Sequence, residues 1–267
     1  MEVFFLKRLL ALALAVMLVV SLCACKNGKE NSDTSTKDSA AAVGQPDPAQ
    51  IRENYQKAVS YIERIIDVSK MQSSEENEEG SDAPYKYWYL SEPMDSVELS
   101  RDILIDGEKI TFGTTTVNDL KSTKFTVETS GEKIPENQAL SVRLIKGEQD
   151  CNLYTGYNYS GKEIPAEKVG DEAICEGIFN VSEYALPFDF SGIKPDSSFE
   201  DIVKILGTPN STLQVSCNGA EVMIYVGYSN SEGKDGSIQN MIFANLSYNA
   251  DDDTSSISTI QYFRRTI

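Results

Sequence analysis

Residues 197–209 read Ser-Ser-Phe-Glu-Asp-Ile-Val-Lys-Ile-Leu-Gly-Thr-Pro and carry the strongest local signal in the chain. Ser197 and Glu200 have the spacing of a capping box, in which each side chain accepts a hydrogen bond from the other residue's backbone N–H. Gly207 and Pro209 predict where this helix ends. The apolar residues recur at three- and four-residue steps and predict one buried helix face. They are Phe199, Ile202, Val203 and Leu206.

Four β-like runs follow this helix, separated by loops rich in Gly, Asn, Asp and Ser. The runs cover residues 212–217, 221–228, 240–248 and 257–264. Strands joined in sequence by short polar connections are typical of antiparallel meanders. Residues 188–267 are therefore predicted to form one unit, a short helix followed by a four-stranded antiparallel meander.

A similar unit is predicted over residues 85–187. Asp106-Gly107 is a tight-turn signal between two β-like runs, and a short helical turn is expected at 116–120. Further strand candidates are residues 125–128, 140–145, 153–157 and 173–179. Residues 110–120 align without gaps on 192–202, which predicts a weak internal repeat; chance similarity is the alternative.

An amphipathic helix is predicted ahead of these two units, over residues 49–71. Its apolar residues form a single stripe. They are Ile51, Tyr55, Ala58, Ile62, Ile65 and Ile66. The acidic run 75–82, EENEEGSD, is interpreted as a solvated loop because it lacks the alternating ligand spacing of a calcium loop. The predicted fold class is α+β: this helix and acidic loop (48–84), then two tandem units of short helix plus antiparallel β-meander.

Residues 1–24 have the pattern of a bacterial lipoprotein signal peptide. Lys7 and Arg8 precede an apolar run of about 14 residues, which suits a signal-peptide core and is shorter than the roughly 20 that span a bilayer. Residues 22–25 read Leu-Cys-Ala-Cys and resemble the lipobox of bacterial lipoproteins. That resemblance implies cleavage before Cys25 and a diacylglyceryl lipid on its sulfur. An ordinary cleaved signal peptide and an uncleaved anchor helix are the alternatives.

Residues 25–47 are polar and small, and they are predicted to be a disordered tether because they cannot bury enough apolar surface to offset their ordering entropy. The predicted location is the extracytoplasmic face of a bacterial cell membrane, where two acyl chains hold a protein stably. The first predicted partner is therefore the membrane, to which the chain is attached through the diacylglyceryl lipid on Cys25.

The charge of the chain limits which other partners it is expected to bind. It has 41 acidic and 24 basic residues, a net charge of −17 at pH 7, and no histidine. Such a chain repels nucleic acid, so no nucleic-acid partner is expected. The lack of histidine removes the commonest general base and the commonest zinc ligand. No metal site and no cofactor are predicted.

Three cysteines follow the predicted lipid attachment site, and their spacing matches no metal-binding pattern. An exported protein can form disulfides, and Cys151 with Cys175 is the predicted pair because both lie on candidate neighbouring strands. The alternative is that all three, including Cys217, are buried free thiols, since free cysteine packs as a small hydrophobe.

Residues 191–264 resemble the repeat of the β-lactamase inhibitor protein and of small outer-membrane assembly lipoproteins. The matching residues are 197–209, the hydroxyl-capped helix that ends in Leu-Gly-x-Pro. The resemblance implies a tandem of two such units that recognises another protein with a sheet surface and performs no chemistry. It transfers no binding residue to this chain, and the long N-terminal helix is outside the pattern.

The predicted function is a non-enzymatic protein-binding or adaptor lipoprotein with an envelope protein as its partner. No catalytic residues are predicted, since the chain has no GxSxG, no Gly-rich phosphate loop and no CxxC. Aromatic residues are enriched at binding hot spots and supply the candidate contacts. These are Tyr85, Tyr87, Trp88, Tyr154, Tyr157, Tyr225 and Tyr228. The alternatives are a solute- or cell-wall-binding lipoprotein and an envelope hydrolase that lacks a recognisable motif.

Overall fold

The structure is a computed structural model that describes residues 47–77, 84–90, 97–181, 185–218, 221–232 and 236–266, all within one compact unit. The predicted signal peptide, most of the predicted tether and Cys25 lie outside these residues. The helices are α2 (Pro48–Ile65), η1 (a 3-10 helix, Val68–Lys70), α3 (Val117–Lys121), α4 (Ala166–Glu172) and α5 (Phe199–Leu206).

Thirteen strands are described. They are β1 (Met71–Asn77), β2 (Pro84–Leu90), β3 (Asp102–Ile105), β4 (Glu108–Thr111), β5 (Thr126–Thr129), β6 (Ser141–Lys146), β7 (Gln149–Thr155), β8 (Cys175–Val181), β9 (Phe188–Asp189), β10 (Thr212–Asn218), β11 (Glu221–Glu232), β12 (Ile238–Asn249) and β13 (Thr254–Thr266). Each strand predicted from the sequence is present, with bounds shifted by a few residues. The acidic run is partly strand, because Glu75–Asn77 belong to β1.

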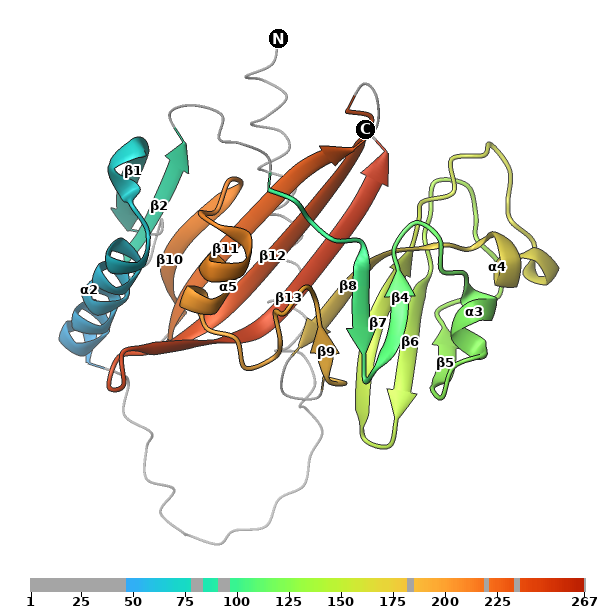
Figure 1. Cartoon of the computed structure of the whole chain (residues 1–267), viewed down its shortest axis with the longest axis horizontal. Helices are drawn as coiled ribbons and strands as arrows, with labels where there is room; N and C mark the ends of the chain where they lie inside the picture. Colours follow the sequence, from blue (N-terminus) through green and yellow to red (C-terminus); the bar gives the residue numbers. More distant parts are fainter. Residues whose placement is uncertain are drawn as a thin grey trace, which may run out of the picture. The chain divides into compact units, whose positions relative to one another are not determined.

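The predicted fold class, a helix followed by two tandem α+β units, is wrong. Ten strands form one continuous antiparallel sheet in the order β1-β2-β10-β11-β12-β13-β8-β7-β6-β5, and β4-β3-β9 form a small second sheet (Figure 1). The two predicted units merge because β13 pairs with β8, for example Tyr262 with Ile178. An unpaired sheet edge exposes a row of backbone N–H and C=O groups, and pairing with another strand satisfies them. The fold is therefore mostly β.

All the described helices and the small sheet cover one face of the ten-stranded sheet, which we call the helix-covered face. Figure 1 shows α2, α5 and the small sheet in front of it. Most apolar residues of α2 and α5 are buried there, among them Tyr55, Ile62 and Phe199, as are inward-facing strand residues such as Ile224 and Ile242. Phe112, which follows β4, stacks on Tyr262 of β13 with ring centroids 4.5 Å apart. These contacts form one apolar core under the helices.

Local capping sets where the short helices begin. In α5 the capping box joins Ser198 and Asp201, so the predicted pair, Ser197 with Glu200, is wrong. The Ser197 hydroxyl accepts a hydrogen bond from the Lys194 N–H instead and closes the preceding turn. The helix ends at Gly207, whose φ of 81° only glycine adopts without strain.

The aligned segment that begins α3 has the same cap, since Thr116 and Asp119 form a capping box there. The similarity between the two segments is limited to these helix caps. It does not separate the fold into two units, because the strands that follow the two helices belong to one sheet.

Candidate functional site

The candidate site is the opposite face of the ten-stranded sheet, on which no described helix lies. Strand alternation places aromatic side chains from six strands on it, and we call this set the aromatic face. Its members are Tyr85, Tyr87 and Tyr89 of β2, Tyr225 of β11, Phe243 of β12, Phe263 of β13, Phe179 of β8 and Tyr154 of β7. All of them except the exposed Tyr89 are half-buried.

The strand register brings these rings together across neighbouring strands. Gln214 is the register partner of both Tyr87 and Tyr225, so one residue separates those two rings across the sheet. Further along, Gln261 pairs with Phe243 on one side and with Phe179 on the other. Side chains directly opposite or diagonal on one face are within reach of each other. The aromatic face therefore runs from β2 to β7 as one surface.

Two glycines lie directly opposite phenylalanines of the aromatic face. Phe243 is the partner of Gly227, and a Cβ built at that glycine would lie 2.8 Å from the Phe243 ring. Gly177 of β8 is the register partner of Phe263 on β13 and of Tyr154 on β7. A Cβ at Gly177 would lie 2.7 Å from the Tyr262 carbonyl oxygen. Because these positions have no side chain, the neighbouring rings lie close against the sheet.

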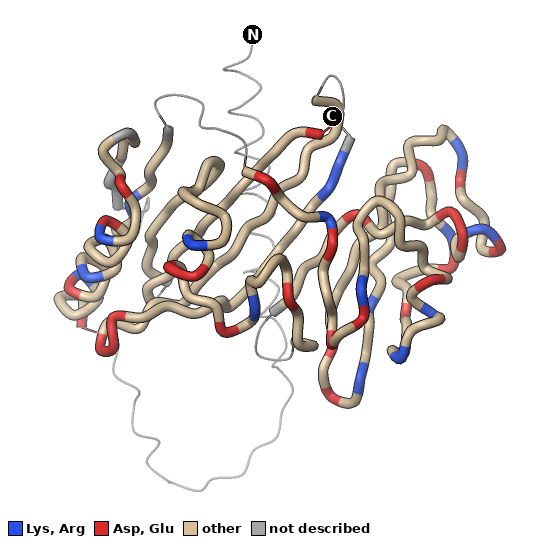
Figure 2. Tube along the Cα trace, viewed as in Figure 1, with Lys and Arg blue, Asp and Glu red and all other residues tan. Residues whose placement is uncertain are grey.

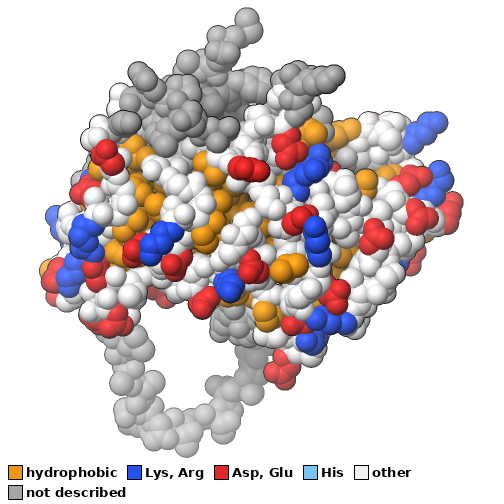
Figure 3. Space-filling model, viewed as in Figure 1, with side chains coloured by type: hydrophobic (Ala, Val, Ile, Leu, Met, Phe, Trp, Pro, Cys, Tyr) orange, Lys and Arg blue, Asp and Glu red, His pale blue; other side chains and the backbone are white. Residues whose placement is uncertain are grey.

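The aromatic face is also nearly free of carboxylates, although the chain has 41 acidic residues. Among its described strand positions from β10 to β8, the one acidic residue is Glu221, at the first position of β11. The tube view shows few charged residues along β10 to β13 (Figure 2). The other side of the molecule presents charges of both signs around its apolar atoms (Figure 3). Depletion of charge together with aromatic and Met enrichment is typical of the core of a protein–protein interface.

Charged pairs mark the margin of the face at β5 to β7. Arg143 of β6 donates through Nε to Asp150 of β7 at 2.7 Å, and its Nη1 lies 3.8 Å from Glu128 of β5. The Arg143 and Glu128 side chains are about half exposed and that of Asp150 is 24% exposed, so the pairs contribute little to stability. They instead give the aromatic face a polar rim.

Four of the seven predicted contact residues lie on the aromatic face: Tyr85, Tyr87, Tyr154 and Tyr225. Trp88 and Tyr228 point to the helix-covered face and are only 3% and 1% exposed, so their prediction as contacts is corrected. Strand alternation separates Tyr225 from Tyr228, which are three residues apart on one strand. Tyr157 lies in the loop after β7, away from the sheet face.

Sequence reasoning missed the other four rings. Tyr89, Phe179, Phe243 and Phe263 each alternate with buried residues of their strand, which is a signal available in the sequence. What the sequence does not give is the pairing of β8 with β13, which brings Phe179 and Phe263 to one surface.

Burial raises the pKa of the Tyr87 and Tyr154 hydroxyls above the ordinary value for tyrosine. Both side chains therefore stay neutral throughout the physiological pH range.

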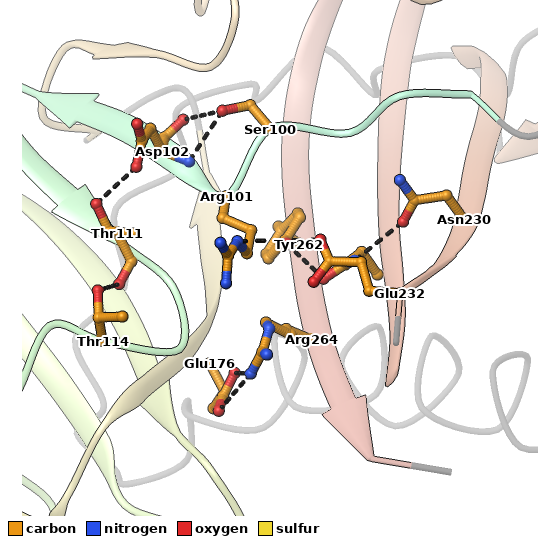
Figure 4. Close-up of polar contacts among 11 residues, drawn as sticks. Ser100, Arg101, Asp102, Thr111, Thr114, Glu176, Asn230, Glu232, Tyr262 and Arg264 are labelled. Carbon is orange, nitrogen blue, oxygen red and sulfur yellow. Dashed lines mark hydrogen bonds and ion pairs between the residues drawn. The ribbon is translucent and has the colours of Figure 1, made fainter. Parts of the chain in front are cut away.

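The helix-covered face carries the buried ion pair of the fold (Figure 4). Arg264 Nη1 lies 3.0 Å from each Glu176 carboxylate oxygen, and their side chains are 15% and 22% exposed. Loss of water around Glu176 raises the pKa of its carboxyl, and the Arg264 guanidinium opposes that rise. The nearby Tyr262 hydroxyl donates to Asn240 Oδ1 at 2.8 Å.

A carboxylate with a raised pKa is one feature that the hydrolase alternative requires. In this molecule, however, both Glu176 oxygens accept from Arg264, and the glycine closest to the pair, Gly113, leaves no room for a Cβ beside the guanidinium. This arrangement is that of a structural ion pair between β8 and β13.

The predicted disulfide between Cys151 and Cys175 is not formed. Both are buried free thiols, as is Cys217. The two residues lie on neighbouring strands, but Cys175 is opposite Thr155, four positions from Cys151. Four residues along a strand span about 13 Å, which exceeds the roughly 7 Å limit for a disulfide. Burial raises the pKa of the Cys175 thiol to about 12.

The described residues offer few other ligand sites. They contain no group of three or more Cys, Asp and Glu side chains that could hold a metal ion. A groove of about 440 Å³ lies beside α2 and is lined mainly by charged and polar residues, among them Glu53, Lys57, Arg64 and Asp253. None of the described helices is both long enough and apolar enough to cross a membrane.

Comparisons with known proteins give no relative. No protein-family model, no curated protein and no solved structure matches the chain. The resemblances to the lipobox and to the β-lactamase inhibitor repeat stay predictions.

Proposed function

We propose that this protein is a membrane-tethered, extracytoplasmic adaptor that binds another protein through its aromatic face. The single observation that carries the proposal is the composition of that face. Eight aromatic side chains from six strands share one surface, and among its described positions from β10 to β8 the one acidic residue is Glu221, in a chain of net charge −17. A random surface of so acidic a protein would carry many carboxylates.

Neither of the two clearest cavities among the described residues is lined by the aromatic face, which favours a protein partner over a small solute. Small ligands bind in concave pockets that enclose most of their surface, whereas broad apolar surfaces with a polar rim bind other proteins. The rings against Gly227 and Gly177 lie close to the sheet, and the Arg143 ion pairs form the rim.

Site-specific photo-crosslinking in cells tests the proposal. A benzophenone amino acid replaces Phe243, Phe263 or Tyr154 in the full chain, and Ile205 as the matched control. Ile205 is an apolar residue of α5 that is 39% exposed on the other side of the molecule. We expect one dominant envelope protein to be cross-linked from the three face positions and not from Ile205. Equal yields from all four positions, or no protein product, would refute the proposal.

The proposed anchor is tested separately. Incorporation of labelled palmitate into the wild-type chain and its loss in Cys25→Ser would support lipidation at Cys25. Cross-linking from the aromatic face should weaken in that variant, because the tether holds the face near the membrane and raises the local concentration of a membrane partner.

One observation favours the alternative function, binding to the cell wall. Tyr157 and Tyr159 are 62% and 70% exposed, and their rings stack with centroids 5.9 Å apart. Between them, the buried Asn158 donates to the carbonyl oxygens of Ile134 and Lys162, which fixes the loop. Exposed rings on a fixed loop can stack against sugar rings. Sedimentation with insoluble peptidoglycan that is lost in Tyr157→Ala and kept in Phe263→Ala would favour this function.

A further inference from the structure

Arg264 and Arg265 are neighbours in β13 whose side chains lie on opposite faces of the sheet. Arg264 shares the helix-covered face with Tyr262 and has its carboxylate partner, Glu176. Arg265 shares the aromatic face with Phe263, and its Nη2 donates to Gln239 Oε1 at 3.1 Å. Among the ion pairs formed by the described residues, none includes Arg265.

The surroundings of Arg265 are apolar or uncharged. Gln239 is its register partner on β12, and Met241 and Phe263 form the next row of the same face. The residue is half-buried, and its Nε is shielded from solvent without a hydrogen-bond partner. The Nε of Arg264 is also without a partner, so the difference between the two arginines is that only Arg264 is paired with a carboxylate. A shielded guanidinium without a counter-charge is costly, and a carboxylate matches its fork of N–H donors.

We propose that the partner brings an aspartate or glutamate side chain to Arg265, within an otherwise uncharged contact surface that covers Met241 and Phe263. This inference rests on the proposed protein-binding role of the aromatic face. Further carboxylates on the partner would meet the acidic remainder of this chain and be repelled. A single acidic group at Arg265 therefore sets the position of the partner on an otherwise non-directional apolar surface.

The probe for this inference is a phage-displayed library of random 12-residue peptides. The full chain, purified from membranes in detergent, selects binders, and the double variant Phe243→Ser/Phe263→Ser removes peptides that bind elsewhere. The peptides are fused at their C-termini, so any carboxylate they present comes from a side chain. Each selected peptide is then synthesised as an amidated pair, with its acidic residue intact or changed to the matching amide.

We expect the acid-to-amide change to weaken binding to the wild-type chain about 10- to 100-fold, the range for a charge-assisted hydrogen bond. With Arg265→Gln the same change should alter affinity less than about twofold, because the interaction is then already lost. Arg264→Gln is the matched control and should behave as wild type in binding. Arg265→Lys keeps the positive charge but lacks the paired N–H donors of the guanidinium. It should therefore retain part of the affinity loss caused by the acid-to-amide change.

The outcomes separate the two proposals. A selection in which no peptide remains after subtraction with the double phenylalanine variant would overturn the proposed function of the aromatic face. Peptides that need the phenylalanines but carry no acidic residue, or whose acid-to-amide change costs the same with Arg265→Gln, would overturn the role of Arg265 alone. Circular dichroism of each variant identifies one that has lost its fold, in which case Arg265→Lys decides.

Discussion

Trp88 and Tyr87 are adjacent on β2, yet they belong to different faces of the large sheet. Trp88 is 3% exposed on the helix-covered face, with Lys86 over its ring and Lys86 paired with Glu63 of α2. Tyr87 lies on the aromatic face and stacks loosely on Tyr89. The same contrast holds for Tyr228 and Tyr225 and for Arg264 and Arg265. One face of each strand packs against the helices, while the other presents half-buried rings and an arginine that has no carboxylate partner among the described residues.

The largest expected effect comes from the Trp88 side of this comparison. Trp88→Ala removes a fully buried side chain and should lower the free energy of unfolding by about 3–5 kcal/mol. Tyr87→Ala, on the other face, should cost about 1 kcal/mol, since it loses one partial ring contact. Urea unfolding followed by circular dichroism measures both. Equal losses in the two variants would show that the faces do not differ as described.

The pair Arg264 and Glu176 gives the next effect. Arg264→Gln leaves the Glu176 carboxylate shielded without its donor and should cost about 1–3 kcal/mol at neutral pH. Burial already raises the pKa of Glu176, and loss of Arg264 removes what opposes that rise. The folded state of the variant then favours the protonated carboxyl. The contribution of Glu176 to the stability of the variant should therefore be fully present below the ordinary glutamate pKa of about 4.3 and be lost as pH rises through the raised folded pKa.

The double variant Arg264→Gln/Glu176→Gln is the control for that pH dependence. It has no carboxyl at this position and should unfold with a pH profile flatter than that of Arg264→Gln between pH 4 and pH 7. Identical profiles for the single and double variants would mean that Glu176 is not the titrating group.

A substitution at Gly177 tests how closely the strands β8 and β13 pack together under the aromatic face. In Gly177→Ala the new methyl would lie 2.7 Å from the Tyr262 carbonyl oxygen, so the backbone of β8 or β13 must shift. We expect a loss of about 1–3 kcal/mol, the range for overpacking. Gly131→Ala is the matched control, because its nearest neighbour is a Leu140 side-chain carbon at 3.4 Å. A loss as large in the control would remove the argument for close packing.

The hairpins and the helices α2, α3 and α5 could be predicted from the sequence because their signals are local, whereas α4 was not predicted and the helix predicted over residues 49–71 ends at Ile65. The Asp106-Gly107 turn, the α5 stripe and the stop at Gly207 each depend on residues a few positions apart. The N-cap residue of α5 could not be assigned from these local signals. Ser197 and Ser198 both have an acidic residue three positions later, and only the turn at Lys194 shows which serine is free to cap.

The architecture could not be predicted, because it depends on pairing between distant strands. Nothing near Phe263 in the sequence indicates that it lies beside Gly177, 86 residues away. The aromatic face was therefore predictable in type but not in extent: four of its five tyrosines were identified, whereas Tyr89 was missed, as were Phe179, Phe243 and Phe263. The tandem-unit prediction failed at the same junction, β8 with β13.

A smaller effect is expected at the caps of the helices that cover the core. Ser198→Ala should cost about 0.5–2 kcal/mol, the usual range for an N-cap. Hydrogen bonds from Ser198 lower the pKa of Asp201, so its contribution is present above the ordinary aspartate pKa and is lost as pH falls through the lowered folded pKa. Thermal unfolding from pH 6 to pH 2 should show a weaker acid dependence in Asp201→Asn. An unchanged acid dependence would place the titrating group elsewhere.

The smallest expected effect is that of a reductant, which should leave stability unchanged. Cys151 and Cys175 are 0% exposed and Cys217 is 8% exposed, and burial raises the pKa of the Cys217 thiol to about 11. A thiol reagent attacks the thiolate, so at pH 8 these cysteines should react only when the fold opens. With the signal peptide removed and Cys25 lipidated, as proposed, native protein should show no rapidly reacting thiol, and denatured protein should show three. A disulfide between Cys151 and Cys175 would instead leave one thiol in denaturant and three after reduction, and its formation would require β7 and β8 to slide by about four residues. Such a slip would also move Tyr154 away from Gly177 and Phe263, so this thiol count tests the register on which the aromatic face depends.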